Sequence, residues 1–431
     1  MARDMARVVT LKNVAPLLGK DRIVAGIFEE TAFECIIPKE TANIGDLYIM
    51  FEADSILPVK PEFEFLRKRS YNEKLNGFLI KAMKMGQKED GTPMRSWALC
   101  MKPEEVGLSE DEIKKLKSGQ DLTERLEVRK NEPLEDASPK GAGKKAYPAW
   151  VKFCLSHTLT RWIGRIWQSM HQNTAGGFPD SEVTRSDETT IQNMPAVLES
   201  HADDKVYITA KLEGQSATTA FDVTRTKSGK IKKVGKFYVC SRNNAYKLKC
   251  NNDFWETAVK LDVERKLRDY YKKTGKLLIL QCEQVGPNIQ NNIYNFKSTR
   301  WYVYLAEDMA TKTQLTYDEL AAACKDMGLD MVPIVADNIA LKDVMPNVEA
   351  AITYAEKSFW KLDEIGNLIM NYEPKDNEKL WRDYFQNEGV VVRSVDCDKL
   401  KSKGFSFKVK NLGYSEQGLG HIANLARQLI K

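Results

Sequence analysis

The sequence lacks the cysteine and histidine patterns of zinc-binding and disulfide-stabilised proteins. Its eight cysteines occur without a C-x-x-C pair, and only four histidines are present among 431 residues. Zinc sites use closely spaced ligands of these two types, and structural disulfides belong to oxidising compartments. We therefore expect free thiols, no zinc site and a cytoplasmic location.

Long apolar stretches are also missing. No window approaches the roughly 18 uninterrupted apolar residues of a membrane-spanning helix. The N-terminal stretch "MARDMARVVTLKNV" has no apolar core of a secretory signal. The sequence therefore predicts neither secretion nor a membrane partner.

A strong excess of charge is absent, but the positive charge is unevenly placed. The net charge of +5 does not by itself indicate a nucleic-acid partner. Nine Lys or Arg and no acidic residue lie between Arg225 and Lys249. Two groups of basic residues have two equally good interpretations, contact with nucleic-acid phosphates or a solvated surface. These groups are Arg67, Lys68 and Arg69, and Lys230, Lys232 and Lys233 in a predicted hairpin tip.

The chain is long enough for two or three domains, and its composition is that of a globular protein. Short alternating runs within residues 7–101 predict a small β-barrel. Later strands and helices alternate irregularly, which predicts an α+β domain of antiparallel sheets flanked by helices. We place the barrel at 1–102, a charged linker at 103–147 and the second domain at 148–431, with a mostly helical insertion at about 338–386.

Five segments of the second domain place polar or charged residues at or beside predicted strand ends. They are "KLEG" at 211–214, "CSRN" at 240–243, "CEQVGPNIQNNIY" at 282–294, "EGVVVR" at 388–393 and "FKVKN" at 407–411. Lys408 and Lys410 share one face of a strand, which favours an anionic ligand. Lys211 becomes a nucleophile only when deprotonated, and burial with neighbouring cations lowers a lysine pKa. Each segment alone is typical of a strand end, but together they indicate phosphoryl transfer.

In this order, the segments resemble the motifs of the covalent nucleotidyltransferases, which comprise DNA ligases, RNA ligases and mRNA capping enzymes. The stretch "GPNIQNNIY" after Glu283 is similar to ATP-dependent RNA ligases. "GDLYIMFEADSILP", "FEFLRKRSYN" and "FPDSEVTRSDETTIQN" resemble the Deinococcus and Naegleria type, which carries an N-terminal OB domain. The resemblance implies an OB-type barrel and an adenylyltransferase domain that uses ATP with Mg²⁺ or Mn²⁺.

The resemblance also implies a role for each motif residue. Lys211 is the residue adenylylated by ATP, Glu388 holds or orients the metal, and Lys408 and Lys410 hold the α-phosphate. The expected nucleotide contacts are Glu213, Glu283 and Arg242 near the ribose, Tyr304 stacked on adenine, and Gly214 leaving room for AMP. The sequence departs from the family where Glu213 replaces the commoner Asp and where Ala210 stands at a position that can be acidic.

The expected function is the sealing of RNA 3′-hydroxyl and 5′-phosphate ends or nicks, by a monomer, through lysyl-AMP and an adenylylated 5′-phosphate. DNA ligases and GTP-using capping enzymes carry a further OB domain after the K-x-K strand, whereas this sequence ends 21 residues after Lys410. These two enzymes remain alternatives, as does a non-catalytic RNA-binding module.

Overall fold

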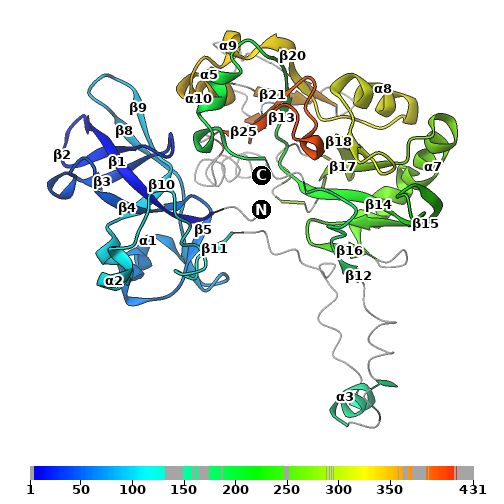
Figure 1. Ribbon diagram of the computed structural model, residues 1–431, viewed down its shortest axis with the longest axis horizontal. Coiled ribbons are helices and arrows are strands. Elements are labelled where there is room, and N and C mark those ends of the chain that lie inside the picture. Colours follow the sequence, from blue (N-terminus) through cyan, green and yellow to red (C-terminus); the bar gives the residue numbers. More distant parts are fainter. Residues whose placement is uncertain are drawn as a thin grey trace, which may run out of the picture.

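The structure is a computed structural model that places a β-barrel beside a larger domain of sheets and helices (Figure 1). It describes residues 4–131, 149–157, 174–185, 188–246, 252–287, 296–357, 359–362, 367–370, 385–386 and 388–411, together with residues 160, 162, 163, 289, 290, 292, 294 and 414.

The barrel consists of three small antiparallel sheets. In the main sheet the strand order is β10-β4-β1-β2-β3, and the other sheets are β11-β5-β7-β6 and β8-β9. The long strand β1 pairs first with β4 and then with β2, with a register shift between Leu11 and Asn13, so it turns the corner between two walls. The bounds are β1 Ala6–Leu17, β2 Lys20–Phe28, β3 Glu34–Pro38, β4 Leu47–Glu52, β5 Ser55–Leu57, β6 Tyr71–Asn72, β7 Gly77–Leu79, β8 Met83–Gln87, β9 Pro93–Ser96, β10 Ala98–Met101 and β11 Arg129–Lys130.

The segment after the barrel differs from the predicted charged linker. Residues 103–131 pack back onto the barrel, where β11 pairs with β5 and the helix α2 (Glu110–Ile113) begins at the N-cap Ser109. Apolar side chains spaced along this charged stretch enter the barrel core, namely Val106, Leu108, Leu122, Leu126 and Val128. The barrel unit therefore extends past residue 102, and the rest of the domain division stays a prediction.

The second domain is built on two antiparallel sheets whose strand orders are β12-β16-β15-β14-β17-β18-β19 and β20-β13-β24-β25. The first sheet comprises β12 Thr174–Gly177, β14 Gln215–Arg225, β15 Ile231–Cys240, β16 Asn244–Tyr246, β17 Leu278–Val285, β18 Arg300–Asp308 and β19 Thr313–Gln314. The second sheet comprises β13 Lys205–Ala210, β20 Ile334–Ala340, β24 Gly389–Ser394 and β25 Ser406–Lys410. The predicted fold class is confirmed.

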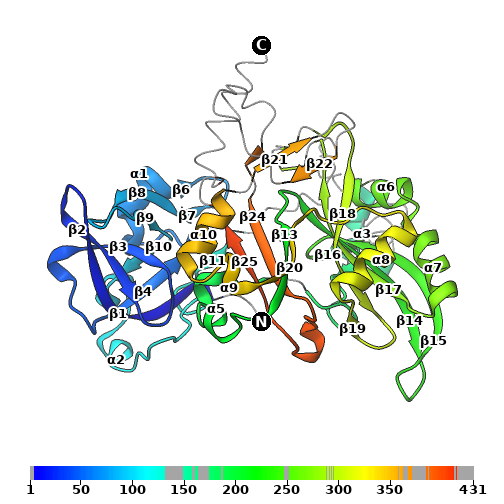
Figure 2. The ribbon, with the colours of Figure 1, turned by 90° about the horizontal axis from the view of Figure 1, so that it is seen from above.

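Helices cover one face of the seven-stranded sheet (Figures 1 and 2). They are α6 (Asp253–Lys260), α7 (Val263–Thr274) and α8 (Tyr317–Met327), and their apolar residues share one core with the sheet. Two helices rather than one cover this stretch, because Asp262 adopts a left-handed φ of 55° and separates α6 from α7. A left-handed residue cannot continue a right-handed helix.

The remaining helices and strands lie around the second sheet. The helices are α5 (Ala196–Ser200), α9 (Leu341–Val344) and α10 (Val348–Glu356), while α3 (Ala149–Ser156) stands apart (Figure 1). A small sheet of β21 (Phe359–Leu362), β22 (Leu368–Met370) and β23 (Phe385–Gln386) follows α10. The insertion predicted to be mostly helical therefore contains strands in its described part. None of the described helices has the length and hydropathy that crossing a bilayer requires.

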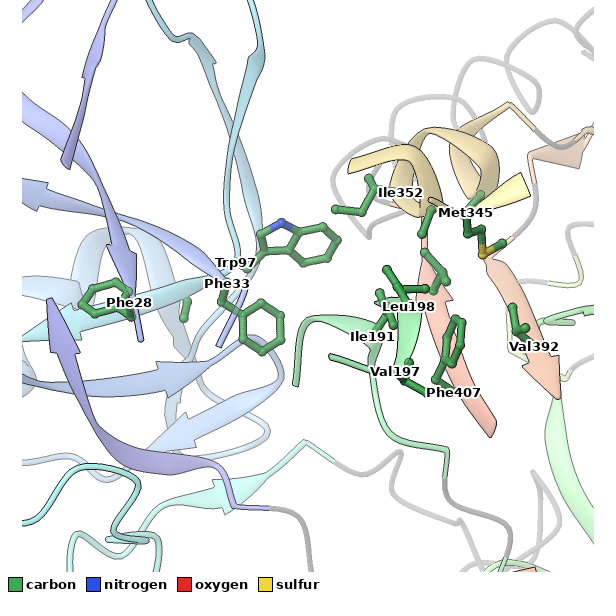
Figure 3. Close-up of a cluster of buried hydrophobic side chains, with 14 of the residues drawn as sticks. Phe28, Phe33, Trp97, Ile191, Val197, Leu198, Met345, Ile352, Val392 and Phe407 are labelled. Atoms are coloured by element: carbon green, nitrogen blue, oxygen red, sulfur yellow. The ribbon is translucent and has the colours of Figure 1, made fainter. Parts of the chain in front are cut away.

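An apolar cluster joins the barrel to the second domain. Figure 3 shows Phe33 and Trp97 of the barrel facing Ile191, Leu198 and Ile352 across the boundary. Arg95 of β9, with a side chain only 8% exposed, pairs with Glu349 and Glu356 of α10 at 3.0 and 2.7 Å. Large apolar burial and the ion pairs of a buried arginine favour a fixed interface over a loose one.

Candidate active site

Three strand ends bring together residues that are far apart in the sequence. Strand β13 pairs with β24 through Ala210 and Val390, and β24 pairs with β25 through Gly389 and Lys410. Figure 2 shows these three strands side by side. Three residues therefore meet at one end of the strands, namely the residue after β13, the residue before β24 and the last residue of β25. They are Lys211, Glu388 and Lys410.

Lys211 lies at the centre of this edge. Its backbone N–H donates to the Gly389 carbonyl at 3.0 Å, and its ammonium forms an ion pair with Glu388. Burial of the ammonium lowers the pKa of Lys211, but the carboxylates of Glu388, Glu283 and Asp54 outweigh burial and leave this pKa raised. The expected lowering of the Lys211 pKa is therefore wrong for this structure, because a carboxylate rather than another cation is its nearest charged neighbour.

The two lysines of β25 lie on one face, as the sequence predicted. Lys410 Nζ contacts Asp54 Oδ2 of the barrel at 2.6 Å. The Lys408 backbone N–H donates to the Thr189 carbonyl at 2.8 Å, which ties β25 to the segment after residue 187. Both side chains are half-buried, while Phe407 and Val409 on the opposite face are buried in the core.

A carboxyl group from the seven-stranded sheet and the guanidinium of Arg242, between β15 and β16, approach the same strand ends. Glu283 of β17 pairs across the sheet with Ser216 of β14, just beyond Gly214. Burial raises the pKa of Glu283 to about 8, while the nearby charges of Lys211 and Arg242 oppose this shift. The structure thus brings Lys211, Glu283 and Arg242 into one electrostatic environment.

Gly214 has a structural reason besides the predicted space for a nucleotide. A Cβ atom at Gly214 would lie 2.5 Å from the Gln284 carbonyl oxygen and 2.9 Å from Glu283 Cγ. Only glycine allows β14 to begin this close to β17. The glycine therefore sets the position of Glu283 relative to Lys211.

Aromatic side chains line the region beside Lys211. Tyr304 of β18 packs on a cluster that includes Ala210 and Leu212, the residues on either side of the lysine. Tyr294 is fully buried there, and its hydroxyl accepts a hydrogen bond from the Glu213 N–H at 2.7 Å. The structure thus places Tyr304 and Glu213 next to the strand end that carries Lys211.

The predicted nucleic-acid residues are not part of this cluster. Arg67, Lys68 and Arg69 form the short helix α1 (Arg67–Ser70), and Lys230, Lys232 and Lys233 follow the turn between β14 and β15. All six residues are exposed. Figure 2 shows α1 and the β14–β15 turn at opposite ends of the molecule, on either side of the strand ends.

Comparison with known families decides the assignment. Residues 204–410 match the family model described as RNA ligase, and residues 5–91 match a model of an OB-fold domain. Residues 204–410 are therefore a domain of the RNA ligase family. The predicted family and the predicted N-terminal OB domain of this RNA ligase are both confirmed. No significant match was found among curated protein sequences.

Solved structures of similar fold support the same architecture. A mutant of the Naegleria gruberi RNA ligase with AMP and Mn has a TM-score of 0.67 at 20% identity, covering 96% of this chain and 98% of that chain. The Naegleria gruberi RNA ligase with PPi also has a TM-score of 0.67 at 20% identity, covering 98% of this chain and 100% of that chain. Another mutant of that ligase, with ATP and Mn, has a TM-score of 0.66 at 20% identity, covering 96% and 97% of the two chains. At this identity the likeness concerns the fold.

The oxygen donors of this RNA ligase suit a metal ion that is shared with a substrate. No three His, Cys, Asp or Glu side chains gather into a metal-binding group anywhere in the described residues. Mg²⁺ typically binds one or two carboxylates together with water and substrate phosphates. The Glu388 carboxylate, which lies between Lys211 and the β25 end, fits that pattern.

The sequence motifs did not identify three residues that lie near the strand ends. Asp54 and Tyr294 contact Lys410 and Glu213 as described above, and the hydroxyl of Tyr414 hydrogen-bonds to the Glu213 carboxylate. Burial, reinforced by the nearby Glu213 charge, raises the pKa of Tyr414. A tyrosine in an aromatic-rich segment and an aspartate in a turn carry no pattern that identifies such contacts.

The raised pKa of Glu283 predicts a pH-dependent effect on stability. The folded protein retains this proton up to about pH 8, whereas the unfolded chain releases it near the ordinary value of 4.5. The stability that Glu283 contributes is therefore present below about pH 4.5 and is lost as pH rises through about 8. Glu283→Gln should raise the Tm relative to the wild type more at about pH 8.5 than at about pH 5. Thermal scans of both proteins at the two pH values measure the effect.

The control for this prediction is Glu256→Gln on α6, which replaces an exposed glutamate outside the strand ends. It should show the same Tm difference from the wild type at both pH values. A Glu283→Gln difference that is also independent of pH would contradict the assignment of a raised pKa to Glu283.

Proposed function

We propose that this RNA ligase uses ATP to join an RNA 3′-hydroxyl to a 5′-phosphate, with Lys211 as the residue that carries AMP. The observation that carries the proposal is the position of Lys211 at a strand end, in contact with Glu388 and beside the lysines of β25. A nucleophilic amine, a carboxylate and cations for phosphate are the groups that covalent nucleotidyl transfer requires. AMP, ATP, PPi and Mn in the related Naegleria structures support the same chemistry.

The first step begins with loss of a proton from Lys211. The Glu388 carboxylate orients the Lys211 amine, since the two side chains are hydrogen-bonded, and the proton passes to solvent. The free amine then attacks the α-phosphorus of ATP, which forms a phosphorus–nitrogen bond as the bond to pyrophosphate breaks. Lys408 and Lys410 stabilise the negative charge on the α-phosphate during attack. Glu388 would help to hold a Mg²⁺ or Mn²⁺ ion, which would supply further charge neutralisation when bound.

The nucleoside is held by residues around the same edge. Glu213, Glu283 and Arg242 bind or orient the ribose, Gly214 leaves room beside it, and Tyr304 stacks on the adenine ring. The neutral form of Glu283 donates a hydrogen bond to a ribose hydroxyl, because burial favours protonation of this carboxyl. AMP then passes to an RNA 5′-phosphate, and the 3′-hydroxyl displaces AMP to form the phosphodiester.

The RNA substrate contacts the exposed basic groups on either side of the strand ends. Arg67, Lys68 and Arg69 in α1 and the lysines at 230, 232 and 233 bind phosphates of a nicked duplex or of paired RNA ends. The enzyme acts as a monomer in the cytoplasm.

Labelling with nucleotide tests the proposed function. The protein is incubated with α-labelled ATP or GTP and either Mg²⁺ or Mn²⁺, and the covalent label is measured on a denaturing gel. We expect label from ATP in preference to GTP, release of that label by RNA with a 5′-phosphate, and sealing of a nick whose 3′-hydroxyl strand is RNA. Covalent label from GTP would indicate a capping enzyme. Sealing of all-DNA nicks as efficiently as nicks with an RNA 3′-hydroxyl strand would indicate a DNA ligase, and the absence of label would indicate a binding module.

A further inference from the structure

The barrel contributes a carboxylate to the candidate active site. Asp54 lies in the turn between β4 and β5, and its Oδ2 atom is 2.6 Å from Lys410 Nζ. The two side chains are 42% and 26% exposed, so the ion pair lies at the mouth of the site. The partner of Lys410 thus comes from a different domain, 356 residues away in the sequence.

The backbone around Asp54 is fixed in place. The Asp54 N–H donates to the Ile80 carbonyl at 2.9 Å, and the Asp54 carbonyl accepts from Asn131 N–H at 2.7 Å. The residue also adopts a left-handed φ of 74°, which aspartate and asparagine tolerate better than most residues. The turn therefore presents the Asp54 carboxylate from one well-defined position.

The domain interface keeps this turn beside β25. Gln192, two residues past the Thr190 bridge to Lys408, accepts hydrogen bonds at its carbonyl from Ala32 N–H and the Thr31 hydroxyl of the barrel, at 2.8 and 2.9 Å. The Arg95 ion pairs and the apolar cluster of Figure 3 fix the barrel to the same sheet. If Lys410 turns toward another anion, Asp54 remains close to that anion.

We propose that Asp54 competes with the α-phosphate of the nucleotide for Lys410, so that the barrel sets the affinity of the ligase domain for nucleotides. This inference rests on the proposed function, in which Lys410 binds that phosphate. Binding costs the Asp54–Lys410 ion pair, and the remaining carboxylate repels the incoming phosphate. Both effects act on any nucleotide that has an α-phosphate and spare the nucleoside.

Asp54→Asn tests the competition, because asparagine keeps the shape and tolerates the positive φ. Exposed ion pairs are weak, so removing this one should tighten binding of AMP and of ATP by about two- to fivefold. Adenosine binding should not change. Isothermal titration calorimetry with AMP, Mg²⁺–ATP and adenosine measures the three affinities. Weaker or unchanged AMP binding, or an equal gain for adenosine, would overturn the inference.

Two further variants separate competition from a general effect of the substitution. Asp46→Asn removes another acid of the barrel, paired with Lys102 at 2.5 Å and 38% exposed, and should leave AMP binding unchanged. In a Lys410→Ala background, Asp54→Asn should bring a smaller gain, because the ion pair is already absent and only the repulsion between Asp54 and the phosphate is removed. A gain as large as that in the wild-type background, or larger, would overturn the inference.

The folding of each variant and the activity of the wild type are checked separately. Asp54→Gly, which also accepts a positive φ, replaces Asp54→Asn if the latter unfolds in a thermal scan. A wild-type protein that binds no ATP would overturn the proposed function. Normal ATP binding by the wild type without a gain in the Asp54 variants would overturn only the competition.

Discussion

Lys211→Ala should lose covalent labelling by ATP, by a factor of at least about 10³, because removing a nucleophile abolishes the step that forms the intermediate. Lys211 is the lysine that the pairing of β13 with β24 places against Glu388. Lys408 and Lys410 lie on β25, which β24 separates from β13, and both are assigned to phosphate, so neither replaces the missing amine. Labelled ATP and a denaturing gel measure the loss.

The matched control is Lys205→Ala, which removes an exposed lysine from the other end of β13. It should label like the wild type. The Lys211→Ala enzyme should still seal RNA that already carries AMP on its 5′-phosphate, since that final step needs the phosphate-binding residues and no lysine nucleophile. Covalent AMP on Lys211→Ala would show that another residue is the nucleophile, and loss of sealing would indicate a wider defect.

The sequence predicted the elements that carry the site because each has a local signal. The segments that contain Lys211, Glu388 and the two lysines of β25 were predicted to lie at strand ends, and the two-residue spacing of Lys408 and Lys410 placed both on one face. The predicted hairpin tip that contains Lys230 lies between β14 and β15, and Gly229 in this turn has a positive φ of 83°. Local periodicity is sufficient for such features because they depend on neighbours in the chain.

Contacts between domains had no such signal. The Asp54–Lys410 pair depends on how the barrel docks, and docking depends on an apolar cluster drawn from both domains. The raised pKa of Lys211 follows from that tertiary arrangement too, because it depends on which charges lie nearest in space. Motif order in the sequence predicted the residues of the site but not which of them pair.

The length of the barrel unit shows a similar limit. Residues 103–131 are rich in charge, so composition suggested a linker, yet a few apolar residues such as Val106 and Leu122 fix the segment to the barrel. Average composition conceals a sparse set of core residues. The position of each apolar side chain decides packing, and that position is known only from the fold.

Glu188→Ala should destabilise the folded protein by about 3–5 kcal/mol, because it leaves buried Arg393 without its counter-ion. Both side chains are 5% exposed and lie 2.9 Å apart, and Glu188 also contacts Lys399 and the Ser406 hydroxyl at 2.5 and 2.6 Å. Burial raises the pKa of Glu188, but Arg393 and Lys399 outweigh it and hold this pKa below its ordinary value. The stabilisation is therefore present above about pH 4.5 and is lost as pH falls.

Denaturant unfolding at neutral pH measures this loss, and two variants define its origin. Asp203→Ala removes an exposed acid that pairs with Lys342 at 2.5 Å and should cost less than about 1 kcal/mol. Combining Glu188→Ala with Arg393→Met should recover part of the stability, because the unpaired buried charge is then gone. A double variant less stable than either single variant would show that the two residues do not act as a pair. Thr189 follows Glu188 directly, and its carbonyl accepts a hydrogen bond from the Lys408 N–H. The Glu188–Arg393 ion pair therefore also holds β25, the strand that carries both phosphate-binding lysines, in place.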